Sequence, residues 1–166
     1  MKIWLLIPIK SFKRPKSRLN DVLTLVERKG LVQRMLKHII KIQQESKLFD
    51  RCLIVTEDKD VLNFIKQLHC HGLLQKKPGL NQAVKEGALE AKKKKVEALF
   101  IMLGDIPQVD KNSLINVINY HKKLVVNNNQ AVTLIPDELG EGSNCMICSP
   151  PNAIPFNYGI DSCSKH

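Results

Sequence analysis

Short apolar runs that alternate with longer amphipathic segments constrain the fold of this chain more than any other feature. The apolar runs are residues 3–9, 51–56, 98–103 and 131–135. The first three have the length and composition of strands that are buried on both faces, and the fourth is predicted to be a further strand. The segments between them, residues 25–44, 58–68, 80–93 and 113–126, place apolar side chains mostly at helical spacing. Strands that alternate with helices pair in parallel through right-handed crossovers. The sequence therefore predicts an α/β fold with a doubly wound, mostly parallel sheet.

The last thirty residues change character. Residues 136–142 form a turn-rich stretch, residues 144–148 a short apolar strand, and residues 150–166 a proline-containing tail. The chain shows no internal repeat and no linker long enough to divide it, and 166 residues is the length of one domain. We expect a single domain over residues 1–166.

A cluster of cations directly follows the first apolar run. Five basic residues and no acid occur within ten positions: Lys10, Lys13, Arg14, Lys16 and Arg18. Open α/β sheets bind phosphorylated ligands at the carboxyl ends of their strands, so this loop predicts an anion site. A solvated basic surface loop is the alternative interpretation.

The overall charge agrees with an anionic partner without choosing one. The chain carries 26 Lys and Arg against 16 Asp and Glu, a net charge of +10. Its apolar start is too short to span a bilayer and runs into cations where a signal peptide would have a cleavage site. Five cysteines without scaffold-like spacing fit reduced thiols. We expect a cytoplasmic protein with no membrane partner. Two tyrosines and one tryptophan offer little base stacking, so nucleic acid is not the expected partner.

Asp105 is the strongest single candidate for chemistry. It follows the buried run 98–103, with Gly104 before it and the Ile106–Pro107 pair after it. A carboxylate at a strand end, facing a basic loop, can hold magnesium between protein and phosphate oxygens. A role as a turn or helix-capping residue is the alternative, although Asp110 is better placed to cap the helix that follows.

Two glycine-containing stretches and one cysteine pair are weaker candidates. Gly79, Leu80 and Asn81 open a predicted helix, whose free amides and asparagine side chain can meet a nucleotide, although a plain helix start explains them almost as well. Residues 140–144 form a glycine-flanked turn that enters a strand. Cys145 and Cys148 lie three positions apart on that strand without a second pair, so we expect them to pack rather than bind zinc.

Five short motifs keep a fixed order along the chain, and together they cover nearly all of it. They are Pro8, Ile9 and Lys10 with Lys16, Ser17, Arg18 and Leu19; Gly79, Leu80 and Asn81; Asp105, Ile106 and Pro107; Gly142, Ser143 and Asn144; and Ile154, Pro155, Phe156, Tyr158, Gly159, Ser162, Lys165 and His166. In this order they resemble the 2-phospho-L-lactate or phosphoenolpyruvate guanylyltransferases, which make the guanosine-diphospho precursor of coenzyme F-420. The resemblance implies a Rossmann-like single domain of the nucleotide-diphospho-sugar transferase (GT-A) type.

The resemblance also implies a reaction and residue roles. A phosphorylated three-carbon acid (2-phospho-L-lactate, phosphoenolpyruvate or 3-phosphoglycerate) would attack the α-phosphorus of GTP and release pyrophosphate. Lys10, Lys16 and Arg18 would hold the triphosphate, Asp105 would bind Mg²⁺, and Lys16, Arg18 and Asp105 would form the catalytic set. Gly79, Leu80 and Asn81 would seat the nucleotide, and Ser143, Gly159 and Ser162 would bind the acid.

The chain departs from the family pattern in two places. Position 143 is serine where the family has threonine, and this change keeps the hydroxyl group. The family also continues past its Ser-x-x-x-His motif into another helix and an aspartate-bearing strand. We expect this chain to lack both and to show reduced turnover.

Three other interpretations stay open: another nucleotidyltransferase of the same fold, acting on molybdopterin or a sugar phosphate; an inactive shortened relative; and a basic nucleic-acid-binding domain. The acid substrate and the oligomeric state also stay open, with a homodimer as one option.

Overall fold

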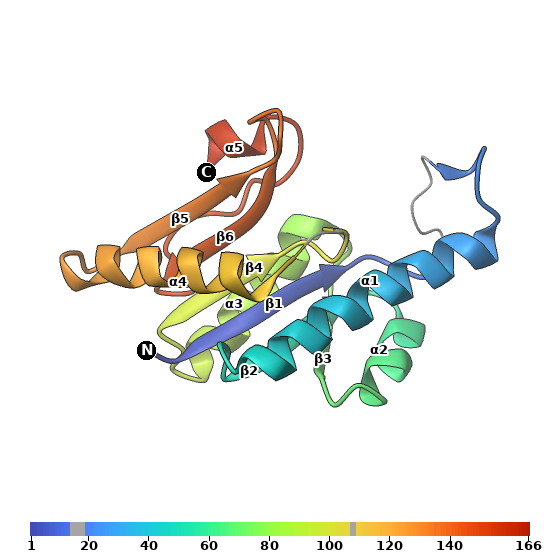
Figure 1. Cartoon of the computed structure of the whole chain (residues 1–166), viewed down its shortest axis with the longest axis horizontal. Coiled ribbons are helices and arrows are strands. Elements are labelled where there is room, and N and C mark those ends of the chain that lie inside the picture. The colour runs from blue at the N-terminus through green and yellow to red at the C-terminus, as the bar shows by residue number, and fades with distance from the viewer. Residues whose placement is uncertain (14–18, 107–108) are drawn as a thin grey trace.

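The chain folds into a single mixed β-sheet with helices packed on both faces (Figure 1). The computed structural model describes residues 1–13, 19–106 and 109–166. The strands are β1 (Ile3–Ile9), β2 (Arg51–Thr56), β3 (His71–Leu74), β4 (Ala98–Met102), β5 (Ala131–Pro136) and β6 (Ser143–Ser149). The helices are α1 (Leu25–Ser46), α2 (Lys59–Lys66), α3 (Leu80–Lys93), α4 (Lys111–Val126) and α5 (Ser162–Lys165).

The sheet order is β3-β2-β1-β4-β6-β5, with parallel pairing from β3 to β4. The predicted α/β fold with a mostly parallel sheet is thus confirmed. Strands β1, β2 and β4 are buried along almost their whole length, because helices cover both faces of the sheet. Burying each large aliphatic side chain contributes about 1.5–3 kcal/mol relative to exposure.

Two apolar clusters fill the space on either side of the sheet. Helices α1, α2 and α4 pack on one face through side chains such as Leu36, Ile65 and Ile118. Helix α3 packs alone on the other face through Ala83, Val84, Ala88 and Ala91. Small alanines let α3 approach the sheet closely, and Figure 1 shows it behind β1 and β4, opposite the other long helices. The molecule therefore has three layers.

The last two strands differ from the expected parallel pattern. β6 lies between β4 and β5 and runs antiparallel to both. Only residues 137–142 connect β5 to β6, and this stretch closes a turn in which Asp137 N–H donates to the Gly142 carbonyl at 2.9 Å. Six residues cannot hold a crossover helix, so the two strands form a hairpin. The expectation of parallel pairing was wrong for β5.

Two elements have no counterpart among the predicted ones. β3 spans four residues, and three of them are exposed at the sheet edge, so it lacks the continuous buried run that marks the other strands. α5 is a single turn within the proline-containing tail, for which no helix was predicted. Two predicted helix caps are confirmed, because Asp58 accepts from Asp60 N–H and Asp110 accepts from Asn112 N–H and Ser113 N–H. Among the described residues, no helix is long and apolar enough to cross a membrane.

Candidate functional site

Lys10 and Asp105 lie at the same edge of the sheet, each just after the carboxyl end of its strand. β1 and β4 are parallel neighbours with Leu6 opposite Ile101, so their carboxyl ends and the residues that follow lie at the same edge. Both residues are exposed. Gly104 allows the close approach, because a Cβ at this position would overlap Cδ1 of Ile9. The structure thus places two of the predicted site residues at one edge of the sheet.

The other residues predicted to act in the basic loop lie outside the part of the chain that the structure describes. Lys16 and Arg18, together with Arg14, lie outside the described residues, as does Pro107 of the predicted metal motif. Their roles stay predictions. The described start of the loop is held at Lys13, whose N–H donates to Ser11 Oγ at 3.0 Å.

Asp58 anchors the start of the basic loop to the end of β2. One carboxylate oxygen, Oδ2, accepts from Ser11 Oγ at 2.6 Å and from the Phe12 N–H at 3.0 Å, while Oδ1 caps α2 through Asp60 N–H at 2.9 Å. Burial acts to raise the pKa of Asp58, but the hydrogen bonds from Ser11, Asp60 and Phe12 outweigh it and hold that pKa below its usual value. The carboxylate is therefore ionised and connects three segments at this edge.

The loop between β3 and α3 is fixed by its own polar side chains. Gln75 Nε2 donates to the Lys77 carbonyl at 2.6 Å, and the Glu86 carboxylate accepts from Lys76 N–H at 2.9 Å. Gly79, the N-cap of α3, has φ 107°, a conformation that side chains disfavour. The helix begins at Leu80 as predicted, and its N-terminus faces the same edge of the sheet as Lys10.

Asn81, predicted to seat the nucleotide, contacts the tail of the chain. Its Nδ2 donates to the Tyr158 carbonyl at 3.0 Å, and its Oδ1 accepts from the Tyr158 N–H at 2.7 Å. The amide side chain thus pairs with the backbone as a neighbouring strand would. Asn81 joins the predicted nucleotide side of the site to the predicted acid side.

Ser143, Ser162 and His166 form a hydrogen-bonded cluster at the start of β6. Ser162 Oγ donates to Ser143 Oγ at 3.1 Å, Ser143 Oγ also contacts His166 Nδ1 at 3.1 Å, and His166 Nε2 accepts from Asn157 N–H at 2.8 Å. Both serines are buried. Leu103 N–H donates to the Asn144 carbonyl at 3.3 Å, which places this cluster beside the end of β4 and near Asp105. Burial lowers the pKa of His166, which favours its neutral form.

Gly159, the third residue predicted to bind the acid, follows Tyr158 directly. It has φ 139°, which requires glycine, and its carbonyl accepts from Ser162 N–H at 3.2 Å. The three residues predicted for the acid therefore belong to one local structure. Their role in binding the acid stays a prediction.

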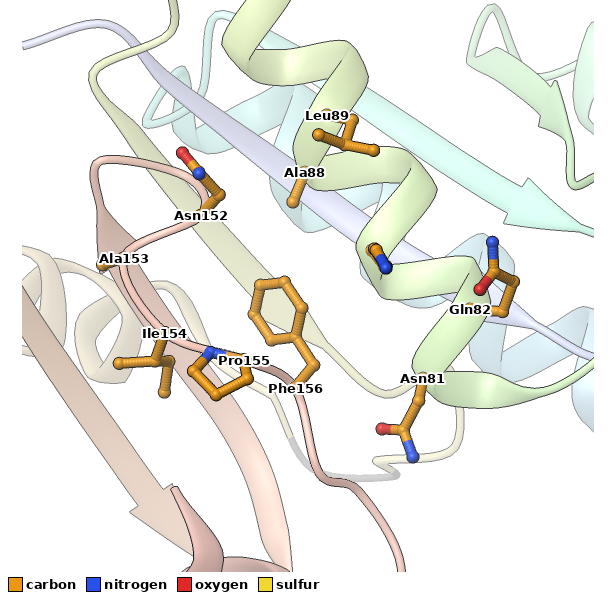
Figure 2. Close-up of a pocket in the computed structure, with 10 residues that line it drawn as sticks. Asn81, Gln82, Ala88, Leu89, Asn152, Ala153, Ile154, Pro155 and Phe156 are labelled. Atoms are coloured by element: carbon orange, nitrogen blue, oxygen red, sulfur yellow. The ribbon is translucent and has the colours of Figure 1, made fainter.

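A pocket of about 460 Å³ lies beside this region, between α3 and residues 152–156 (Figure 2). The side chain of Phe156 points from the 152–156 segment toward α3. Asn81 and Gln82 line the pocket at the start of the helix. Ile154 and Phe156 also pack against the α3 face of the sheet. Residues 154–156 of the closing motif thus form the side of the pocket that faces α3.

Asp105 fits magnesium only with help from a substrate. Within residues 1–13, 19–106 and 109–166, no group of three His, Cys, Asp or Glu side chains can hold a metal ion. A single exposed carboxylate supplies a hard oxygen ligand, and magnesium commonly completes its coordination with waters and substrate phosphates. The donor chemistry is therefore suitable for a phosphate-bound Mg²⁺.

The cysteine pair on β6 packs as expected. Cys148 is fully buried in the cluster under α3, and Cys145 packs against the opposite cluster, as alternation along a strand requires. Burial raises the pKa of each thiol to about 12. Neither thiol is a reactive thiolate near neutral pH.

Sequence reasoning missed two functional contacts. Asp58 was predicted as a helix cap, but nothing in the sequence indicated that its second oxygen holds the basic loop, because that contact spans more than forty positions. His166 was noted within the closing motif without a role, and its position four residues after Ser162 was the available signal.

Comparisons with known proteins agree with this arrangement. Residues 1–166 match the family described as "Guanylyl transferase CofC like". A phosphoenolpyruvate guanylyltransferase of Rubrobacter xylanophilus is 30% identical over 166 residues, covering 100% of this chain and 78% of the relative. A 2-phospho-L-lactate guanylyltransferase of Methanobrevibacter smithii is 34% identical over 165 residues, covering 99% and 69%. A 3-phospho-D-glycerate guanylyltransferase of Colwellia psychrerythraea is 26% identical over 166 residues, covering 100% and 76%.

Solved structures resemble the fold at low sequence identity. A protein of Desulfovibrio desulfuricans G20 that is named as a nucleotide-diphospho-sugar transferase has a TM-score of 0.73 at 16% identity, covering 93% of this chain and 67% of that one. A CMP:2-keto-3-deoxy-manno-octonic acid synthetase has a TM-score of 0.55 at 11% identity, covering 95% and 68%. At these identities the likeness shows the fold alone, and it confirms the predicted nucleotide-diphospho-sugar transferase type.

Proposed function

Because this chain belongs to the CofC-like guanylyl transferase family, we propose that it transfers GMP from GTP to a phosphorylated three-carbon acid in coenzyme F-420 biosynthesis. An oxygen of the acid's phosphate forms a bond to the α-phosphorus of GTP. The bond between that phosphorus and the bridging oxygen to the β-phosphate breaks, and pyrophosphate leaves with its electron pair. The product is a phosphoanhydride between GMP and the acid.

The transfer needs charge neutralisation and alignment more than it needs a protein nucleophile. Lys10, Lys16 and Arg18 hold the triphosphate and stabilise the charge that develops on pyrophosphate. Asp58 keeps the described start of that loop against the end of β2 through Ser11 and Phe12. Gly79, Leu80 and the N–H groups of the first turn of α3 face the nucleotide.

Asp105 would hold Mg²⁺ against the phosphate oxygens. When bound, the ion would supply Lewis-acid stabilisation of the transferring phosphoryl group. Asp105 is exposed at the same sheet edge as Lys10, where a ligand would be able to share its carboxylate. The carboxylate's own task is to fix where the α-phosphate lies relative to the basic loop.

Ser143, Gly159 and Ser162 would bind the acid. They lie at the start of β6 and in the segment beside it, next to the end of β4. Hydroxyl and backbone N–H groups suit a carboxylate or phosphate acceptor. An acid held there would approach the α-phosphate from the side opposite the basic loop.

The family match over the whole chain, with the described site residues at one sheet edge, is the observation that supports this proposal most strongly. The relatives are named for three different acids, so the acid must be found by experiment.

The test is pyrophosphate release by the full chain with Mg²⁺. GTP, ATP, CTP and UTP would each be combined with 2-phospho-L-lactate, phosphoenolpyruvate, 3-phosphoglycerate or no acid. We expect release that requires GTP and one of the acids. Release that prefers another nucleotide, or none with any acid, would refute the proposal.

A further inference from the structure

Asn81 and His166 hold the same short piece of backbone from two directions. Asn81 forms hydrogen bonds with both polar groups of the Tyr158 backbone: its Oδ1 accepts from the N–H at 2.7 Å, and its Nδ2 donates to the carbonyl at 3.0 Å. His166 Nε2 takes the preceding N–H, that of Asn157, at 2.8 Å, and its ring packs edge-on against the Tyr158 ring. We call this pair of residues, with the backbone of 157–158 that they hold, the tail clamp.

The hydrogen bonds of the tail clamp determine which nitrogen of His166 carries the proton. Because Nε2 accepts from Asn157 N–H, the neutral ring must carry its proton on Nδ1. Nδ1–H then donates to Ser143 Oγ, which also accepts from Ser162 Oγ. Both lone pairs of Ser143 Oγ then accept hydrogen bonds, so the only further hydrogen bond that this hydroxyl can make is one in which it donates its own proton. Ser143 is therefore set as a donor, the polarity that an anionic ligand requires.

The tail clamp also precedes Gly159 directly. Within the described parts of the chain, Gly159 N–H has no hydrogen bond, although its carbonyl accepts from Ser162. Its φ of 139° depends on the direction in which the chain leaves Tyr158. The tail clamp thus contacts both halves of the predicted acid site, because Gly159 follows Tyr158 in the chain, and Ser162 bonds to both the Gly159 carbonyl and Ser143 Oγ.

We propose that Asn81 is a positioning residue for the acid rather than a contact to the nucleotide, acting with His166 through the backbone of residues 157–158. This inference rests on the proposed function and assigns Asn81 to the other substrate. Both polar atoms of the Asn81 side chain already have partners on the tail, and the pocket beside it is walled by the same tail segment (Figure 2). Loss of the Asn81 contact frees the backbone that Gly159 continues, while α3 and the loop before it keep their own hydrogen bonds.

Asn81→Asp is the sharpest variant, because it keeps the shape and the acceptor for Tyr158 N–H but replaces the donor by an oxygen facing the Tyr158 carbonyl. His166→Asn keeps a donor near the Nδ1 position, whereas His166→Phe keeps the ring packing and removes both nitrogens. Lys92→Ala is the control, since Lys92 is an exposed residue near the far end of α3 and does not line the pocket.

The experiment measures KM for GTP and KM for the acid separately in the full chain, with melting temperatures alongside. In Asn81→Asp and His166→Phe we expect KM for the acid to rise about tenfold, the effect of about one lost hydrogen bond of this kind, with KM for GTP unchanged. His166→Asn should recover part of the loss, and Lys92→Ala should behave as the parent. A rise confined to KM for GTP would overturn the inference, as would an equal rise in both constants that follows a fall in melting temperature.

A second readout is independent of turnover. ¹⁵N NMR of the His166 ring in the parent chain should show the Nδ1–H tautomer, and the Nε2–H tautomer would contradict the inference. If the parent chain released no pyrophosphate, the proposed function would fail. Calorimetric titration of phosphoenolpyruvate into the parent and Asn81→Asp would then decide the inference separately, because equal affinities would overturn it.

Discussion

Replacing Asp58 by alanine removes three contacts of one carboxylate and should affect both stability and GTP use. The α2 cap is worth about 1 kcal/mol. The buried Phe12 N–H loses its acceptor, which costs about 1–3 kcal/mol. Together these give a loss of about 2–4 kcal/mol in the free energy of unfolding. For a chain of 166 residues, each kcal/mol shifts Tm by about 2–4 °C, so we expect a fall of about 5–15 °C.

Two matched variants separate the cap from the loop anchor. Ser11→Ala removes two bonds at the start of the basic loop, the 2.6 Å bond to Asp58 and the 3.0 Å bond that Ser11 Oγ accepts from Lys13 N–H. It leaves the cap intact, so it should raise KM for GTP with a smaller loss of Tm. Asp110→Ala removes an equivalent cap from α4 without touching the basic loop, so it should leave KM for GTP unchanged. Urea unfolding and steady-state kinetics would measure both effects.

The pH dependence gives a further check on Asp58. Its folded pKa lies below the unfolded value, so its stabilisation is present above about pH 4 and is lost as the pH falls through the folded pKa. The parent should lose more stability than Asp58→Asn in that acidic range. Equal acid sensitivity, or an Asp58→Ala variant with unchanged Tm and KM, would refute the anchoring role.

Three further predictions concern other charged groups. Asp105→Asn should abolish magnesium-dependent turnover, because the amide lacks the charge that Mg²⁺ requires, and should leave Tm unchanged, because the side chain is exposed. Calorimetric titration of Mg²⁺ with GTP present would show the lost binding. Surviving activity would favour a turn role for Asp105. Lys16→Ala and Arg18→Ala should each raise the Kd for GTP by about 10- to 100-fold, the value of a charged hydrogen bond, with Tm unchanged, and unchanged affinity in both would remove the loop from the site. Burial lowers the pKa of His121, so the folded state favours the neutral ring and stability should fall as the pH drops below the unfolded pKa of about 6.5. Urea midpoints measured from about pH 7 to about pH 5 should change less in His121→Leu than in the parent. Equal changes in the two chains would contradict this prediction.

The elements predicted correctly from sequence are those with local signals. β1, β2 and β4 are continuous buried runs, and the caps at Asp58 and Asp110 are signalled by residues next to their helices. β3 was missed because an exposed four-residue edge strand has no such run. The antiparallel pairing of β5 was missed because alternation with helices predicts a parallel neighbour, whereas the short turn after β5 makes a hairpin that places β6 between β4 and β5.

The candidate site was predictable as a set of motifs but not as a set of contacts. Lys10 and Asp105 were identified by their positions at strand ends, and parallel neighbours necessarily bring such ends together. The pairing of Asn81 with Tyr158 joins positions 77 apart in sequence, and the bonds from Asp58 to Ser11 and Phe12 join positions more than forty apart. No local pattern encodes these pairs, because they depend on how α3 and β2 pack in three dimensions.

The central claim is that this chain forms a bond between GMP and a phosphorylated acid, and ³¹P NMR of the reaction mixture tests it most directly. With GTP, Mg²⁺ and the acid that supports pyrophosphate release, we predict equal amounts of pyrophosphate and of a new diphosphate whose two phosphorus atoms are coupled to each other. GDP with inorganic phosphate, or pyrophosphate with free GMP and unchanged acid, would contradict the account.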